Sequence, residues 1–127
     1  IEKLKLRVYT YYLNMTSSEE FWGPIRCQYK DIKHLCLNNV RNDITNRTQD
    51  YQGWHFTNMG GLEEVRRKVK ANYNDIMFNK QLIDSPALDI RFGVMDYIGR
   101  DFKLEVSEEN WPPWLKEHRQ EFISMIK

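Results

Sequence analysis

The densest group of residues that could do chemistry is the run GWHFTNMGGLEE, at residues 53–64. It combines a histidine, a pair of glycines and two carboxylates. An apolar segment that delivers a histidine beside a two-glycine turn, followed by a helix that begins with carboxylates, often places several polar groups around one cleft. The glycines permit a backbone conformation, or a close ligand approach, that a side chain would forbid. The run therefore predicts a junction that lines a binding or catalytic cleft.

The histidine, the two carboxylates and the aromatic residues of this run also have structural explanations. Glu63 and Glu64 are the acidic residues that a helix dipole favours in a first turn. A histidine such as His55 on an apolar strand is more often a core residue than a ligand. Trp54 and Phe56 suit core packing as well as stacking on a ligand. Because side chains alternate along a strand, His55 must point away from both aromatic residues.

Two further groups of charged residues follow in the sequence. Asp96 and Arg100 lie four residues apart around Gly99, so they could orient a substrate or pair with each other, and we favour the pairing. The basic run at residues 66–68 suits the solvated face of a helix better than a phosphate site.

Several motifs together carry a family resemblance. GWHF at 53–56 and GGLEE at 60–64 are preceded by YYLN at 11–14 and WGP at 22–24, and followed by GVMDYIGR at 93–100. In this order the motifs resemble the C-terminal half of glycosyltransferase family seventeen, and the resemblance spans nearly the whole chain. The family includes the β-1,4-mannosyl-glycoprotein 4-β-N-acetylglucosaminyltransferases as well as bacterial and viral members.

The resemblance implies an α/β fold, the C-terminal portion of a GT-A-like nucleotide-sugar transferase with a mixed sheet and flanking helices. It also implies inverting transfer of a sugar, N-acetylglucosamine in the typical case, from a UDP-sugar donor to a glycan hydroxyl, with Mn²⁺ or Mg²⁺. Such a reaction needs a divalent ion for the leaving diphosphate, a carboxylate base and aromatic surfaces for the sugar rings. The implied roles are a catalytic base for Glu63 or Glu64, metal or diphosphate contact for His55, and substrate contact for Trp54, Asp96 and Arg100.

One part of the family pattern is missing. The sequence contains no Asp-x-Asp motif of the kind that binds the metal in the nucleotide half. We therefore expect this chain to be the acceptor-side half of a longer catalytic domain, inactive without its N-terminal half. A non-enzymatic carbohydrate-binding or interaction module is the alternative, and the aromatic content of 13% suits both.

Composition limits the possible partners and the domain organisation. With 127 residues and 41% hydrophobic residues, the chain suits one domain over residues 1–127. A net charge of +1, spread along the chain, argues against nucleic acid, and the absence of a long apolar run argues against membrane contact from this segment. Cys27 and Cys36 are expected to be reduced and half-buried. Nothing in them requires an oxidising compartment, so we expect the cytoplasm, or the Golgi lumen for a eukaryotic protein.

The elements that must position these residues follow from periodicity and punctuation. Leu4, Leu6 and Val8 alternate as in a strand, whereas Ile1, Leu4, Val8 and Tyr11 also fit a helical stripe. Aromatic and β-branched residues favour a strand over 8–13. Residues 25–29 alternate again. Residues 35–37 suggest the end of a helix, and the polar residues 38–52 predict a long surface loop.

The second half of the chain has stronger signals. Residues 53–56 predict a short buried strand, and Leu62, Val65, Val69 and Tyr73 predict an amphipathic helix whose charges complement its dipole. A second helical stripe runs through Ile76, Lys80 and Ile83. Residues 88–98 predict a strand and a turn. Pro112-Pro113 opens a final helix whose apolar face is formed by Leu115, Phe122 and Ile126.

Overall fold

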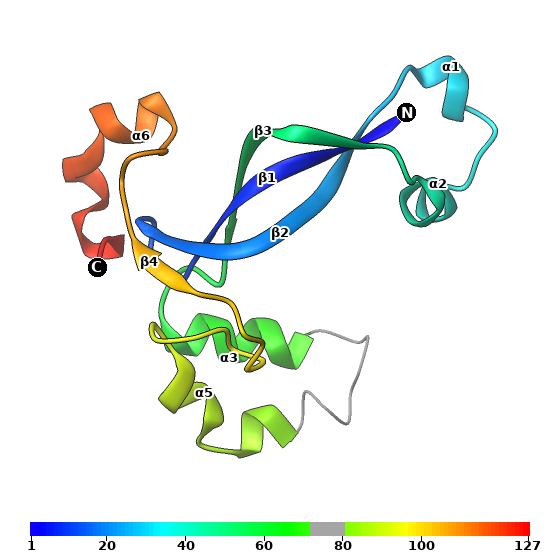
Figure 1. Cartoon of the computed structure of the whole chain (residues 1–127). Helices are drawn as coiled ribbons and strands as arrows, with labels where there is room; N and C mark the ends of the chain where they lie inside the picture. The colour runs from blue at the N-terminus through cyan, green and yellow to red at the C-terminus, as the bar shows by residue number, and fades with distance from the viewer. Residues whose placement is uncertain (72–80) are drawn as a thin grey trace. The chain divides into compact units, whose positions relative to one another are not determined.

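The structure is a computed structural model that describes residues 1–71 and 81–127 (Figure 1). In those residues it has a four-stranded mixed sheet with the strand order β3-β1-β2-β4, together with helices. The strands are β1 (Glu2–Thr10), β2 (Met15–Arg26), β3 (Arg47–Thr57) and β4 (Leu104–Val106). The predicted α/β class with a mixed sheet is therefore confirmed at that level.

Strand directions decide which strand ends lie together. The Lys3 N–H donates to the Asn46 carbonyl (2.9 Å) near the start of both strands, and the Tyr11 N–H donates to the Thr57 carbonyl (3.3 Å) near their ends. Strands β1 and β3 are therefore parallel, and their carboxyl ends share one edge. Strand β4 pairs antiparallel with the start of β2, with Met15 opposite Val106.

Among the described residues, all helices except one are short. They are α1 (Tyr29–Ile32), α2 (Leu37–Asp43), α3 (Leu62–Ala71), α5 (Ala87–Arg91), α6 (Pro113–Glu117) and the 3₁₀ helix η1 (Arg119–Met125), and residues 81–84 are also helical. Helix α3 confirms the amphipathic prediction, because Val65 and Val69 are buried while its first turn is acidic and its last turn basic. Within the described part of the chain, no helix is long and apolar enough to cross a membrane.

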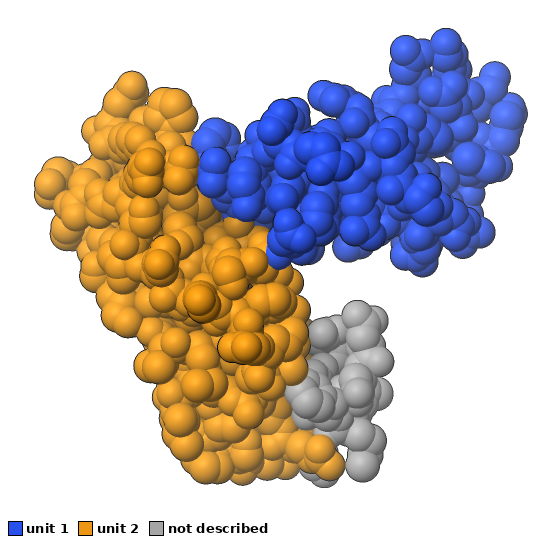
Figure 2. Space-filling model, viewed as in Figure 1, with its two compact units in different colours: residues 1–7, 20–55 blue, residues 8–19, 56–127 orange. Residues whose placement is uncertain are grey.

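The chain divides into two compact units, shown in Figure 2. Unit 1 comprises residues 1–7 and 20–55, and unit 2 comprises residues 8–19 and 56–127. The boundaries fall within β1 and β2 and near the end of β3, so neither unit is one continuous segment. The expectation of a single domain stays a prediction.

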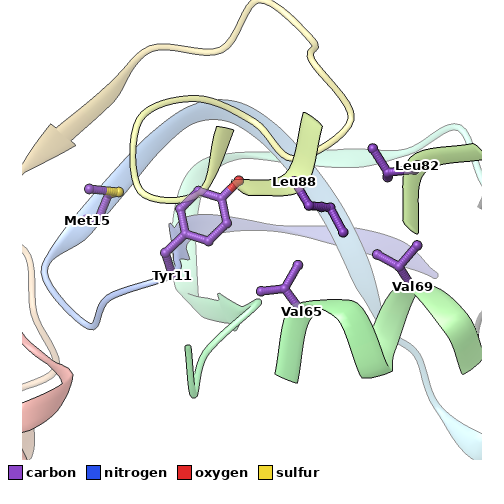
Figure 3. Packing of buried hydrophobic residues seen from close by; sticks show 6 residues of the cluster. All are labelled: Tyr11, Met15, Val65, Val69, Leu82 and Leu88. Carbon is purple, nitrogen blue, oxygen red and sulfur yellow. The ribbon is translucent and has the colours of Figure 1, made fainter. Parts of the chain in front are cut away.

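Most of the buried apolar side chains belong to unit 2, in two clusters. The first contains Tyr11, Met15, Val65, Val69, Leu82 and Leu88 (Figure 3). The second contains Tyr9, Leu13, Trp111 and Leu115, with Phe122 and Ile126 packed against it. The indole N–H of Trp111 donates to the Leu13 carbonyl at 2.6 Å. Leu115, Phe122 and Ile126 thus share one cluster, and Pro113 opens α6 as predicted. The prediction of one helix through all three is wrong, because α6 ends at Glu117, Phe122 lies in η1 with non-helical backbone angles, and Ile126 follows η1.

The predicted loop over residues 38–52 is wrong. Helix α2 and the first half of β3 occupy it, although its residues are mostly exposed. Pairing with β1 gives these polar residues their strand hydrogen bonds, and no local pattern reveals that partner. Residues 53–56 do form a strand, as the end of β3, but the prediction that they are buried is wrong because Trp54 is 40% exposed.

Residues 88–98 contain a helix where a strand was expected. The N–H groups of Ile90 and Phe92 donate to the carbonyls of Pro86 and Leu88, so residues 87–91 form α5, and the predicted turn follows. Leu88 is the one buried residue of α5, and the partly buried Ala87 packs against the same core cluster.

Three smaller predictions at the start of the chain have mixed outcomes. Strand β1 starts earlier than the predicted strand over 8–13 and ends at Thr10, because Tyr11 has a φ of 66° that turns the chain. Residues 35–37 lead into α2, which begins at Leu37, rather than end a helix. Cys27 is half-buried but Cys36 is exposed, and both thiols are free.

The predicted helix through Ile76, Lys80 and Ile83 can be compared only at its end. Residues 81–84 are helical and the helix stops before Ser85. Ile76 and Lys80 lie outside the described residues, as does Tyr73.

Candidate functional site

The structure separates the predicted site residues into two groups. Trp54 and His55 belong to unit 1. Glu63, Glu64, Asp96 and Arg100 belong to unit 2, where an ion pair joins Asp96 to Arg100. Two shallow pockets of unit 1 lie around Val40, and neither is lined by any of these residues.

His55 packs against an aromatic side chain. Its ring stacks on the Phe21 ring with a centroid separation of 4.2 Å and an interplanar angle of 20°. In the part of the chain that the structure describes, no three histidine, cysteine, aspartate or glutamate side chains could together hold a metal ion. The described residues therefore do not by themselves form a divalent-ion site around His55, and the metal contact that the family resemblance implies for it stays a prediction.

Glu63 and Glu64 lie in the first turn of α3, where both pair with arginines of the next turn. Glu63 is 87% exposed and lies 3.5 Å from the Arg66 guanidinium. Glu64 accepts a hydrogen bond from the Arg67 Nε at 2.8 Å and forms an ion pair with its Nη2 at 2.7 Å. These pairs have the i,i+3 spacing that stabilises a helix surface.

The glycine pair has the backbone role that the sequence predicts. Gly60 and Gly61 have φ values of 90° and 89°, in the left-handed region that disfavours residues with a Cβ. A Cβ on Gly60 would also lie 3.0 Å from the Cγ of Glu64. The two glycines therefore allow β3 to turn directly into α3.

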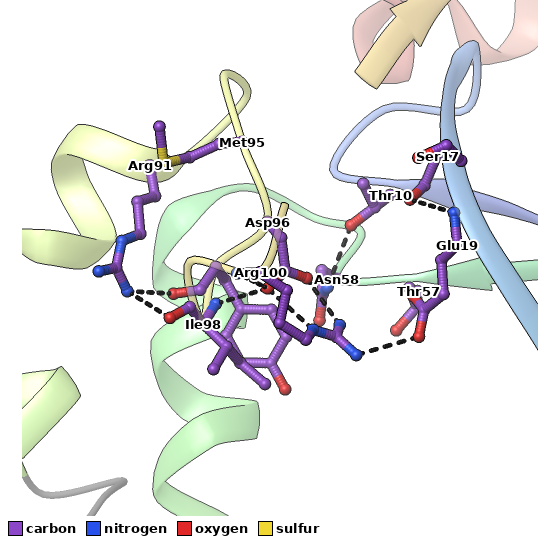
Figure 4. A network of polar contacts seen from close by, with 12 residues as sticks. Thr10, Ser17, Glu19, Thr57, Asn58, Arg91, Met95, Asp96, Ile98 and Arg100 are labelled. Carbon is purple, nitrogen blue, oxygen red and sulfur yellow. Dashed lines mark hydrogen bonds and ion pairs between the residues drawn. The ribbon is translucent and has the colours of Figure 1, made fainter. Parts of the chain in front are cut away.

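The carboxyl ends of the parallel strands β1 and β3 carry a buried polar contact. The Asn58 amide nitrogen donates to the Thr10 hydroxyl oxygen at 3.0 Å (Figure 4). Asn58 has a φ of 56°, which asparagine tolerates better than most residues. Its amide oxygen accepts from the Lys68 ammonium at 2.8 Å, and Lys68 also donates to the Thr57 hydroxyl at 2.6 Å.

Lys68 is held by neutral acceptors. Partial burial lowers the pKa of its ammonium below the ordinary value of 10.5, and the nearby Glu19 carboxylate opposes that shift. Within residues 1–71 and 81–127, Lys68 makes no ion pair at 4 Å or less. Its cation therefore has capacity for a further acceptor.

Arg100 connects two carboxylates. Its guanidinium donates to both oxygens of Asp96, at 3.0 and 2.7 Å, and to Glu19 at 3.1 Å (Figure 4). Burial alone would raise the pKa of Asp96, but hydrogen bonds from Arg100 and from the N–H of Ile98 hold that pKa below 3.8. The predicted pairing of Asp96 with Arg100 is confirmed.

The segment 93–100 is fastened to its surroundings on both sides. The Tyr11 hydroxyl donates to the Met95 carbonyl at 2.6 Å, and burial raises the pKa of that hydroxyl. The Arg91 guanidinium donates to the carbonyls of Tyr97 and Ile98, at 3.1 and 2.8 Å. These bonds hold Asp96 and Arg100 at fixed positions.

We call the resulting group the strand-end polar cluster; it consists of Thr10, Glu19, Asn58, Lys68, Asp96 and Arg100. All six residues belong to unit 2. The cluster offers two cations, one partly exposed carboxylate and neutral polar groups at one sheet edge. Such a mixture can both donate to and accept from a ligand hydroxyl.

Sequence reasoning missed four members of the cluster, namely Thr10, Glu19, Asn58 and Lys68. An asparagine between a strand and a glycine pair is a turn signal that could have drawn attention to Asn58. Glu19 had no such signal, because its partner Arg100 lies 81 residues away.

No protein-family model, curated protein or solved structure matches this chain.

Proposed function

We propose that this chain is part of a glycosyltransferase and that the strand-end polar cluster binds the acceptor sugar. The observation that carries the proposal is the position of Glu19, whose carboxylate pairs with the Arg100 guanidinium at 3.1 Å near the carboxyl ends of β1 and β3 and raises the pKa of Lys68. The motifs at 53–64 and 93–100, which suggested sugar transfer, contribute Asn58, Asp96 and Arg100 to this cluster.

The position of the cluster supports a ligand site. In α/β proteins, ligands bind outside the carboxyl ends of parallel strands, because the loops that follow those strands supply the polar groups. Here β1 and β3 are the parallel pair, and Thr10 and Asn58 lie at or just after their ends. Glu19 and Arg100 are also partly exposed, at 22% and 41% of their side chains.

The chemistry of the cluster suits a sugar. Each hydroxyl of a sugar donates one hydrogen bond and accepts others, so it is held best between a carboxylate and a cationic donor. Glu19 can accept from such a hydroxyl, while Lys68 can donate to it. Asp96 is already saturated by four hydrogen bonds, so its role is to hold Arg100 in place.

In the proposed reaction the acceptor hydroxyl oxygen attacks the anomeric carbon of a UDP-sugar. The bond from that carbon to the diphosphate breaks, UDP leaves with the electron pair, and the hydroxyl proton passes to a carboxylate. Glu63 and Glu64 are the bases that the family resemblance implies, and Glu19 is the carboxylate that the cluster adds. The nucleotide and any Mn²⁺ or Mg²⁺ would be held by a part of the protein other than the described residues.

The test is sugar transfer by the full-length protein. Release of UDP from UDP-N-acetylglucosamine is measured with Mn²⁺, with and without a mannose-containing glycan acceptor, for the wild type and for Glu19→Gln, Glu63→Gln and Glu64→Gln. Loss of the base lowers turnover by roughly 10²-fold or more. Glu117→Gln, on an exposed residue of α6, is the matched control. Full activity in all three variants would eliminate these carboxylates as bases.

The alternative is a carbohydrate-binding module without catalysis. The pairing of all three candidate carboxylates, Glu19, Glu63 and Glu64, with arginines favours it, because a carboxylate engaged with a guanidinium is a weaker base. The two functions differ in one result. A module binds the glycan, with chemical-shift changes at Glu19 and Lys68, while the full-length protein releases no UDP from any sugar donor.

A further inference from the structure

Cations and aromatic rings alternate across three strands of unit 1. The Arg47 guanidinium lies 4.8 Å from the centre of the Trp22 ring, and the Lys5 ammonium lies 5.2 Å from the same ring and 5.0 Å from the Tyr51 ring. The Arg7 guanidinium lies 4.0 Å from the Tyr51 ring. We call these five residues the cation–aromatic row.

In the middle of the row, a hydrogen bond fixes the Trp22 ring and an ion pair neutralises the Lys5 charge. The Trp22 indole N–H donates to the Thr48 carbonyl at 3.2 Å, which sets the ring position. Lys5 is 16% exposed and pairs with Glu20 at 2.8 Å, a hydrogen bond that raises the pKa of the Lys5 ammonium. Lys5 therefore holds the two rings in place and has little capacity for a ligand.

The two ends of the row differ from the middle. Among the described residues, neither Arg7 nor Arg47 forms a side-chain hydrogen bond or an ion pair; each contacts the face of a ring. A guanidinium that is stacked by its face keeps its N–H donors at its edge, and this planar edge matches the two oxygens of a carboxylate. The row thus presents two oriented guanidiniums without oxyanion partners.

We propose that the cation–aromatic row binds an acidic glycan, with the carboxylates of uronic acid residues held by Arg7 and Arg47. The geometry by itself calls for an oxyanion, and the choice of a glycan rests on the proposed function. Single-stranded nucleic acid fits less well, because its bases need open aromatic faces and each ring here already has two cations over it. The net charge of +1 also lacks the excess of positive charge that favours binding to the phosphates of a nucleic acid.

The test is direct binding to the full-length protein, without a sugar donor. A hexamer of galacturonic acid is compared with neutral cellohexaose and with a thymidine hexanucleotide, by calorimetry and by chemical-shift changes. The hexauronate binds more tightly than both, and its affinity falls as salt rises. Arg7→Gln and Arg47→Gln each weaken binding by about three- to tenfold, which corresponds to the loss of one charge-assisted contact near the surface.

Two further variants separate this role from charge or folding. Arg26→Gln removes the same charge from unit 1, at a residue paired with Glu2, and leaves binding unchanged. Arg47→Lys keeps the charge but lacks the planar fork, so it restores less than the full affinity. Unfolding midpoints that match the wild type show that each variant is folded.

Three results would overturn the proposal: equal affinity for the hexauronate and cellohexaose, tighter binding of the hexanucleotide, or an equal loss in Arg26→Gln. Its failure is distinguishable from failure of the proposed function. A protein that transfers sugar but does not bind the hexauronate overturns only the role of the row. A protein that binds the hexauronate without releasing UDP overturns only the transferase.

Discussion

Replacement of Asp96 by asparagine removes the charge that organises the segment 93–100. The Asp96 side chain is 8% exposed and accepts four hydrogen bonds, from the N–H groups of Ile98 and Arg100 (both 3.1 Å) and from the Arg100 guanidinium (3.0 and 2.7 Å). An asparagine oxygen can still accept from the two backbone groups, but its amide nitrogen would face an Arg100 donor. The variant loses one charge-assisted bond and weakens the others.

The expected cost follows from that count. A hydrogen bond to a charged group contributes about 1.5–3 kcal/mol, and the lower half of this range applies because Arg100 is partly exposed. We therefore expect Asp96→Asn to lower the free energy of unfolding by about 2 kcal/mol at pH 7, measured by urea denaturation. Asp101→Asn is the matched control, because Asp101 is exposed and close in the sequence.

The pH dependence gives the second half of the test. Because the pKa of Asp96 is lower in the folded protein than its ordinary 3.8, its contribution is fully present above that value and is lost as the pH falls through the folded-state pKa. The stability difference between wild type and Asp96→Asn should be constant from pH 7 to pH 5 and shrink below about pH 4. A difference under about 0.5 kcal/mol at pH 7, or one that grows toward low pH, would refute this account of the carboxylate.

Three other changes have definite expected results. Gly60→Ala should cost roughly 1 kcal/mol or more in urea denaturation because its φ is 90°, and an unchanged midpoint would contradict the left-handed turn. Glu19→Gln should lower the pKa of Lys68 further, since the Glu19 carboxylate raises it. The pKa is measured by NMR of the Lys68 side chain, and an unchanged value would show that the two residues are not neighbours. Trp111→Phe keeps a ring but leaves the Leu13 carbonyl without its 2.6 Å hydrogen bond. The free energy of unfolding, measured with urea or heat, should fall by about 1–2 kcal/mol. An unchanged value would mean that water replaces the indole N–H.

Local sequence patterns were enough to predict some helices correctly and one contact of the site. The period and charge order of residues 62–71, the two glycines before them and the proline at residue 113 predicted α3 and the start of α6 correctly. Asp96 and Arg100 are four residues apart, so their pairing was also readable from the sequence. These features depend on interactions within a few residues, which sequence order already fixes.

Tertiary structure alone decided the strand at residues 47–57 and the strand-end polar cluster. Polar residues 47–52 form a strand because they pair with β1. A local sequence pattern carries no information about a strand partner so far away in the sequence. The cluster depends on the parallel pairing of β1 and β3, which brings Thr10 to Asn58, and on the contact of Glu19 with Arg100 across 81 residues. Residue types along the chain can identify groups able to do chemistry, but which of them meet depends on strand order and direction, which long-range pairing fixes.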